Sequence, residues 1–214
     1  MEIGRGAQYK VIDTPDGRVK KIPLSIEESQ AVIASWHGTN RAPKSKLPIN
    51  YIELTKRACR KIKRLIKDYP GIAYTFGNPI FEGEGVYTQD KVPTLGEVLN
   101  KSSIAESKLL IDLYIELIIF HWRYGISDVV YNFTVNNGVD NDGRVILLDF
   151  GELTSSEAKT RSQITKKRWL HAFSYNQEIP ETLKKYYINS MHKRLTTQLL
   201  SENWATALNI PKNF

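Results

Sequence analysis

Cysteine is almost absent from this sequence, whose 214 residues include only Cys59. A single cysteine excludes an internal disulfide, and a chain without disulfides is typical of a reducing compartment. We therefore expect the protein in the cytoplasm. Cys59 also stands at an apolar position of a helical pattern, which predicts a core residue rather than a catalytic thiol.

Long apolar runs are missing as well. The most apolar segment, residues 109–120, is interrupted by Asp112 and Glu116. It is also shorter than the roughly 18–20 residues that a membrane-spanning helix needs. The first ten residues, MEIGRGAQYK, contain no apolar signal region. The sequence therefore predicts neither a membrane span nor a secretory leader.

The composition allows a folded core and leaves the chain basic. Hydrophobic residues make up 41% of the sequence, which suits one domain or two small lobes. The formal net charge is +7, from 30 Lys and Arg against 23 Asp and Glu. An excess of this size favours polyanionic partners such as a nucleotide, nucleic acid or an anionic membrane surface, without choosing among them.

The order of patterns predicts an α+β protein with a compact bilobal fold. We expect a β-rich N-lobe over residues 1–92 and a short, mostly helical C-lobe over residues 93–214. The strands expected in the first lobe cover residues 3–12, 17–24, 72–77 and 79–90, the last segment with a turn at residues 83–85. The helices expected in this lobe cover residues 25–36 and 49–68. The second lobe is expected to hold helices at 104–123, 157–173, 180–201 and 202–208 and one hairpin at 129–153.

Two features of the first lobe suit a phosphate. Gly4 and Gly6 would let backbone N–H groups approach it closely, although a tight turn explains a lone GxG pattern equally well. In the next strand, side chains alternate between two faces, so Lys21 shares its face with Val19 and Lys20 points the other way. We favour Lys21 because Val19 could then cover a flat apolar base. Two solvated lysines on an edge strand are the alternative.

The expected hairpin at 129–153 has polar residues at its two ends. Asn132 precedes the apolar run Phe-Thr-Val, and Asp149 follows Val-Ile-Leu-Leu and opens the segment Asp-Phe-Gly-Glu. An amide and a carboxylate oxygen suit a divalent ion that also binds nucleotide phosphates. Ordinary turn formation at the ends of a hairpin explains the same residues equally well.

Taken together, these motifs resemble the protein kinase-like superfamily. IGRGAQYKV is similar to a glycine-rich loop, RVKKI to the strand that carries the ATP-pairing lysine, and YNFTV with VILLDFGE to the catalytic-loop Asn and the DFG segment. The match runs from residue 3 to about residue 153. Within the superfamily the chain most resembles the small bacterial PhoP-regulatory-network (YrbL-like) family, which places it in a bacterial or phage cytoplasm.

The resemblance implies a role for each matching residue. Lys21 would pair with the α- and β-phosphates of ATP, and Asn132 and Asp149 would hold Mg²⁺. The remaining ATP-binding positions that it implies are Gly4 and Gly6 in the phosphate lid, Val19 over the base, and the hinge from Gln89 to Val92.

The chain departs from the kinase pattern at two places. Kinases carry the catalytic Asp five residues before the metal-binding Asn, where this chain has Ser127, with Asp128 one position later. Asp128 can take the catalytic role if the loop is one residue shorter. The expected acidic partner of Lys21 is Glu53, although a charge favoured by the N-terminal end of the helix dipole explains Glu53 as well.

Three functions follow from these residues. The first is an ATP- and Mg²⁺-dependent phosphotransferase acting on an unidentified acceptor. The second is a pseudokinase that keeps nucleotide binding as a regulatory or interaction module. The third is a basic nucleic-acid-binding protein. Basic residues of the C-terminal helices, among them Lys159, Arg161 and Arg194, would suit an acidic or phosphorylated acceptor or protein partner.

Overall fold

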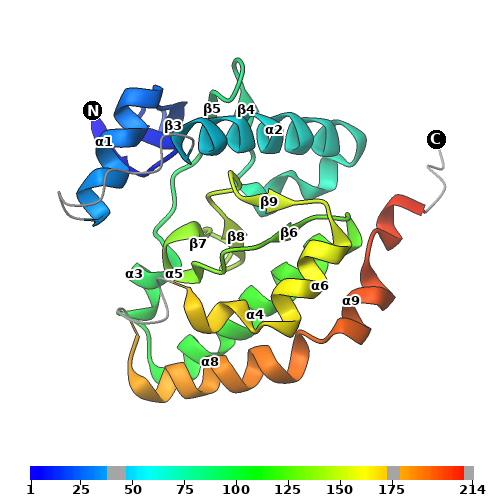
Figure 1. Cartoon of the computed structure of the whole chain (residues 1–214). Coiled ribbons are helices and arrows are strands. Elements are labelled where there is room, and N and C mark those ends of the chain that lie inside the picture. The colour runs from blue at the N-terminus through cyan, green and yellow to red at the C-terminus, as the bar shows by residue number, and fades with distance from the viewer. Residues whose placement is uncertain (38–46, 173–178, 210–214) are drawn as a thin grey trace. The chain divides into compact units, whose positions relative to one another are not determined.

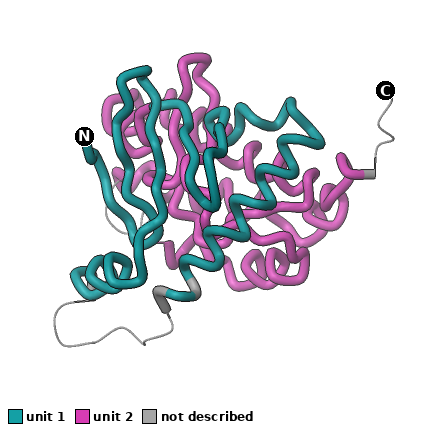
Figure 2. The backbone as a smooth tube through the Cα atoms, turned by 90° about the horizontal axis from the view of Figure 1, so that it is seen from above, with its two compact units in different colours: residues 1–91 teal, residues 92–214 magenta. Residues whose placement is uncertain are grey.

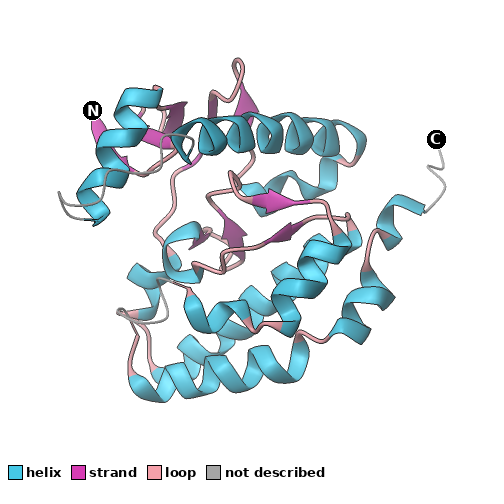
Figure 3. Ribbon diagram, viewed as in Figure 1, coloured by secondary structure: helices cyan, strands magenta, loops and turns pink. Residues whose placement is uncertain are grey.

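The computed structural model describes residues 1–37, 47–172 and 179–209. The chain divides into two compact units, Met1–Lys91 and Val92–Phe214 (Figure 2). The first unit is built on an antiparallel sheet, and the second is mostly helical with two small sheets (Figure 3). The predicted α+β class, with a β-rich first part and a helical second part, is confirmed. In the described ranges, no helix is both long and apolar enough to cross a membrane.

The first unit contains one five-stranded sheet in the order β1-β2-β3-β5-β4 (Figure 1). Its strands are β1 (Glu2–Arg5), β2 (Tyr9–Asp13), β3 (Arg18–Pro23), β4 (Ile80–Phe81) and β5 (Tyr87–Asp90). Its helices are α1 (Ile26–His37), α2 (Leu47–Asp68) and the 3-10 helix η1 (Pro70–Phe76). The Tyr9 hydroxyl lies 3.1 Å from the Cys59 sulfur on α2, and Cys59 is buried, as its apolar position predicts.

Two strand predictions in this unit are wrong. The segment 3–12 is two strands, because the Gly6 N–H donates to the Tyr9 carbonyl at 2.9 Å and closes a turn between them. The segment 72–77 is helical rather than extended. Pro70 starts its 3-10 helix, and Gly77 ends it in the left-handed region at φ 65°.

The second unit packs further helices and two short antiparallel strand pairs around the partly buried helix α4. Its helices are α3 (Leu95–Leu99), α4 (Ile104–Arg123), α5 (Phe133–Asn136), α6 (Glu157–Thr165), η2 (Arg168–His171), α8 (Glu181–Arg194), α9 (Thr197–Asn203) and η3 (Thr206–Asn209). Its strands are β6 (Ser127–Asp128), β7 (Asn137–Val139), β8 (Val145–Leu147) and β9 (Leu153–Thr154). β6 pairs with β9 and β7 pairs with β8, both antiparallel.

The hairpin expected over 129–153 is shorter than predicted. Its strands are only β7 and β8, and the Phe-Thr-Val run that was expected in a strand begins helix α5. Tyr131 takes the left-handed conformation at φ 55°, which interrupts an extended backbone just before this run. The expected helix 157–173 likewise ends at Thr165, and its residue 173 lies outside the described residues. The helix expected over 180–201 is two helices, α8 and α9.

Gly138 fixes the place where β7 meets the start of the second unit. A Cβ at this position would lie 2.6 Å from Val92 Cγ2 and 2.7 Å from the Pro93 carbonyl oxygen. That oxygen cannot move freely, because it accepts a hydrogen bond from the Val139 N–H at 3.1 Å. We therefore expect Gly138→Ala to destabilise the protein by about 1–3 kcal/mol, measured by urea unfolding.

The matched control for this substitution is Gly83→Ala. Nothing lies within 4 Å of a Cβ built at Gly83, and its φ is outside the left-handed region. Gly83→Ala should therefore leave the free energy of unfolding nearly unchanged. An equal loss in the two variants would contradict the close approach at Gly138.

Candidate functional site

The carboxylate of Asp128 organises the loop that follows β6. Its Oδ1 accepts a hydrogen bond from the Val130 N–H at 2.9 Å, and its Oδ2 accepts one from the Tyr131 N–H at 3.2 Å. Asp128 is 8% exposed and Tyr131 is fully buried. The two hydrogen bonds close the backbone around the carboxylate, so that Asn132 follows directly at the start of α5.

Asn132 and Asp149 lie at opposite ends of the short helix α5. The Asn132 carbonyl accepts from the Asn136 N–H at 2.8 Å, which closes the helix. The Asn136 carbonyl in turn accepts from the backbone N–H groups of Leu148 and Asp149, at 2.7 Å and 3.1 Å. A four-residue helix is about 6 Å long, so the backbones of the two residues are held a short and fixed distance apart. Both side chains are half-buried.

Three carboxylates of this segment influence one another. Burial, and then the nearby charge of Asp149, raises the pKa of Asp128 to about 6. Burial, followed by the charges of Asp149 and Asp128, raises the pKa of Glu152 to about 7, and only Lys159 opposes this rise. The segment therefore concentrates negative charge in a place where water screens it poorly.

The donors of this segment fit a nucleotide-bound magnesium ion better than a metal ion held by protein alone. Among the described residues, no group of three or more His, Cys, Asp or Glu side chains could hold a metal ion by itself. Magnesium that is bound with nucleotide phosphates takes one or two protein oxygens and keeps several waters. Asn132 and Asp149 carry an amide and a carboxylate oxygen of this kind, and a divalent cation beside them would relieve the repulsion that raises the pKa values of Asp128 and Glu152.

Ser127, which stands at the catalytic spacing, uses its hydroxyl in contacts within the fold. Its hydroxyl is fully buried, accepts a hydrogen bond from Trp122 Nε1 at 3.2 Å, and donates to the Asp128 carbonyl at 3.0 Å. These contacts fix Trp122 of α4 to strand β6. Of the two residues considered for catalysis, Asp128 is thus the one with a titratable group in the segment.

In the first unit, strand β3 separates its two lysines. Val19 and Lys21 are both 7% exposed and lie on the buried face of the strand, and the Lys21 ammonium lies 5.9 Å from the centre of the Tyr87 ring. Lys20 points the other way and pairs with Glu82. The alternation of the strand therefore places Val19 and Lys21 on the same face.

Gly4 and Gly6 are not explained by the packing of the chain. A Cβ at Gly4 would make only ordinary contacts at 3.9 Å with Val11, and nothing lies within 4 Å of a Cβ at Gly6. Neither glycine has a left-handed φ. Gly4 lies in β1 and Gly6 opens the turn to β2. The space beside the Gly6 backbone is therefore open for a ligand to approach.

The expected hinge residues lie at the end of β5 and directly after it. Gln89 is 1% exposed, pairs with Val19 across the sheet, and its Oε1 is buried with no hydrogen-bond partner among the described residues. Val92 is half-buried and begins the second unit. A buried amide oxygen without a donor is costly, and a bound ligand or water that donates to it would lower this cost.

Glu53 is placed poorly for the role expected of it. It lies on the exposed side of α2 and makes no ion pair in the described part of the chain, whereas Lys21 is buried. The structure therefore does not support Glu53 as the partner of Lys21.

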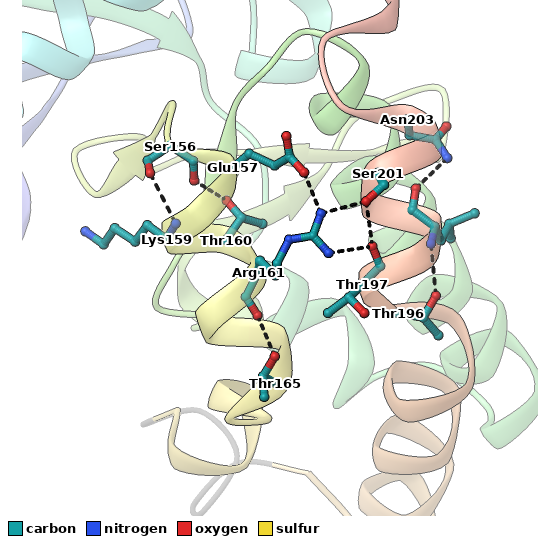
Figure 4. Close-up of polar contacts among 11 residues, drawn as sticks. Ser156, Glu157, Lys159, Thr160, Arg161, Thr165, Thr196, Thr197, Ser201 and Asn203 are labelled. Atoms are coloured by element: carbon teal, nitrogen blue, oxygen red, sulfur yellow. Dashed lines mark hydrogen bonds and ion pairs between the residues drawn. The ribbon is translucent and has the colours of Figure 1, made fainter.

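The basic residues of the C-terminal helices are partly neutralised within their own unit. Figure 4 shows Arg161 reaching from α6 to α9, where its guanidinium donates to Ser201 Oγ at 2.6 Å and to the Thr197 carbonyl at 3.2 Å. Arg161 also pairs with Glu157 at 2.6 Å. Arg194 similarly pairs with Asp112 and Glu116 of α4. These two arginines therefore connect helices of the second unit, and the expected acidic acceptor stays a prediction.

Comparisons with known proteins assign no family. No model of a known protein family matches the chain, and no curated protein matches it. Among solved structures, the chain is similar to the Rio2 kinase of Chaetomium thermophilum, which was solved as an ADP/Mg²⁺-phosphoaspartate complex. The match has 16% sequence identity and a TM-score of 0.48, and covers 96% of this chain and 68% of that chain. A likeness of this size assigns neither ligand nor activity. The YrbL-like resemblance therefore stays a prediction.

Two features of the site were missed by sequence reasoning. Glu152 is the last residue of the segment Asp-Phe-Gly-Glu, but only the fold shows that the charges of Asp149 and Asp128 raise its pKa. The packing of Trp169 against this loop could not be predicted, because the residue is distant in sequence. Its ring packs edge-on against Tyr131 with centroids 5.7 Å apart.

Proposed function

We propose that the protein binds ATP with Mg²⁺ and transfers the γ-phosphoryl group to a hydroxyl acceptor. The observation that carries the proposal is the segment from β6 to β9. One β6–β9 pair brackets α5 and the β7–β8 hairpin, and this frame holds Asp128, Asn132 and Asp149 by backbone hydrogen bonds. Phosphoryl transfer needs this kind of positioning together with charge neutralisation.

The residues of the candidate site would contact different parts of the nucleotide or its metal ion. Asn132 and Asp149 would bind the magnesium ion, which neutralises the phosphate charge when it is present. Lys21 would pair with the nucleotide phosphates, and the open backbone at Gly4 and Gly6 would lie against them. Val19 would cover the base, while Gln89 and Val92 would lie beside it.

Asp128 would receive the proton of the acceptor. Each carboxylate oxygen has a second lone pair beyond the one used by Val130 or Tyr131, so it can accept this proton. The acceptor oxygen then forms its bond to the γ-phosphorus, and the bond from that phosphorus to ADP breaks. The raised pKa of Asp128, about 6, suits proton transfer near neutral pH.

Thermal unfolding with and without ATP and Mg²⁺ tests the nucleotide site. A ligand that binds only the folded state raises the melting temperature, with a free energy of about 2.7 kcal/mol at a concentration of about 100 Kd. We expect a magnesium-dependent rise for the wild type and none for Lys21→Ala or Asp149→Ala. Lys20→Ala is the matched control, because Lys20 pairs with Glu82 on the other face of β3 and should keep the rise.

A pseudokinase differs from this proposal at Asp128 rather than at the nucleotide. It predicts the same rise in melting temperature but no ADP formed by the wild type. No rise at saturating nucleotide would contradict both functions and leave the nucleic-acid-binding alternative.

A further inference from the structure

Helix α2 carries most of the excess positive charge of the protein. The chain has a formal net charge of +7, and α2 alone holds seven basic residues against Glu53 and Asp68, a net charge of +5. The basic residues are Lys56, Arg57, Arg60, Lys61, Lys63, Arg64 and Lys67. The charge is therefore concentrated on one element of the first unit, visible as the long helix of Figure 1.

These seven side chains share one face of the helix. At about 100° per residue they fall within an arc of about 160° around the axis. The opposite face is buried, with Cys59, Ile62 and Leu65 at 3%, 0% and 7% exposure. We call the arc of seven residues the basic face of α2.

The described part of the chain neutralises this face only in part, although Glu53 and Asp68 lie within the same arc. Glu84 is shared by Lys56 and Arg60, at 3.6 Å and 2.7 Å, and Asp68 lies 3.9 Å from Arg64. The other three exposed basic residues make no ion pair in the described part of the chain: Arg57, Lys63 and Lys67. Like charges three or four residues apart on a helix repel each other, and an external polyanion beside the face would relieve this repulsion.

We propose that the basic face of α2 binds the phosphate backbone of nucleic acid without reading its sequence. From Lys56 to Lys67 the helix is about 17 Å long, which corresponds to about five base pairs at 3.4 Å each. Three of the seven residues are arginines, whose planar guanidinium groups match phosphate oxygens in pairs. This binding is separate from the nucleotide site and does not depend on it.

The geometry favours nucleic acid over a membrane surface. A helix that lies in a membrane interface inserts an apolar face, and the apolar stripe of Cys59, Ile62 and Leu65 on α2 is already buried in its own unit. The basic arc contains no aromatic residue that could anchor in the headgroup region. The basic face therefore presents mainly cationic groups, which suit phosphate groups along a nucleic-acid backbone.

Fluorescence anisotropy with a labelled DNA duplex of about 20 base pairs, at about 50–200 mM NaCl, tests the proposal. The test variant combines Arg57→Gln, Lys63→Gln and Lys67→Gln. Glutamine favours helices nearly as well as Lys and Arg, so α2 should persist. Each lost phosphate contact lowers the slope of log K against log salt by about 0.9, so we expect it to fall by about 2–3. Binding at about 50 mM salt should weaken at least tenfold.

The control removes the same charge from the second unit. Lys101, Lys166 and Lys185 are exposed, and the combined variant Lys101→Gln, Lys166→Gln and Lys185→Gln has the same net charge as the test variant. It should bind within about twofold of the wild type. Equal weakening in both variants would overturn the proposal, as would the absence of duplex binding by the wild type. Binding to vesicles containing phosphatidylserine but not to the duplex would overturn it as well.

Discussion

Asp128→Asn is expected to lower the rate of phosphoryl transfer by about 10²–10⁴-fold, which is the usual contribution of a positioned general base. Asparagine keeps the size of the side chain and one oxygen for the backbone of the loop, but it cannot accept the proton of the acceptor. One of the two loop N–H groups, that of Val130 or that of Tyr131, loses its acceptor, which costs about 1–3 kcal/mol of stability, so the rate is compared per folded molecule. ADP release from ATP measures the rate, with water or an added hydroxyl compound as acceptor.

Ser127→Ala serves as the comparison, because it should lower the stability of the protein and leave the rate of phosphoryl transfer unchanged. It leaves the buried Trp122 Nε1 without its acceptor, which costs about 1–3 kcal/mol of stability. The rate per folded molecule should stay close to that of the wild type. The reverse result, with Ser127→Ala inactive and Asp128→Asn active, would assign the catalytic position to Ser127 and contradict the role proposed for Asp128. A wild type that releases no ADP would favour the pseudokinase.

The parts of the fold that depend on local chemistry could be predicted from the sequence. Ser25 and Glu28 form the expected capping box at α1, with reciprocal hydrogen bonds of 2.9 Å and 3.2 Å. Ser103 caps α4, which ends at Arg123 as the apolar pattern predicted. The period of two along β3 placed Val19 and Lys21 together, because neighbouring side chains of a strand must face opposite ways.

The loop around Asp128 could not be predicted in the same way. Phe133, Thr134 and Val135 favour a strand by propensity, but the hydrogen bonds of Asp128 and the left-handed Tyr131 turn the chain into α5 instead. The buried Trp169 that packs on Tyr131 is nearly forty residues away in sequence. Tertiary contacts of this kind override local preference, and no spacing rule in a single sequence reveals them.

Glu152 should make a contribution to the stability of the protein that falls as the pH rises from about 4.5 to about 7. Its pKa is raised from 4.5 to about 7 by burial and by the charges of Asp149 and Asp128. The folded state therefore holds the proton more tightly than the unfolded state. The favourable contribution is complete below pH about 4.5 and is lost as the pH passes the folded pKa. A shift of this size corresponds to about 3 kcal/mol.

Glu152→Gln should remove this loss, because glutamine has the shape of the protonated acid and carries no charge. We expect the variant to be more stable than the wild type by about 2–3 kcal/mol at pH about 8 and equally stable at pH about 4.5, measured by urea unfolding. Glu181→Gln, on the exposed first turn of α8, makes the same charge change and should leave the pH dependence of the wild type in place. Identical pH profiles for Glu152→Gln and the wild type would show that Glu152 is ionised in the folded state without cost. Such a result would separate Glu152 from the charge of Asp128 and Asp149, and with it remove the argument that a cation beside them relieves their repulsion.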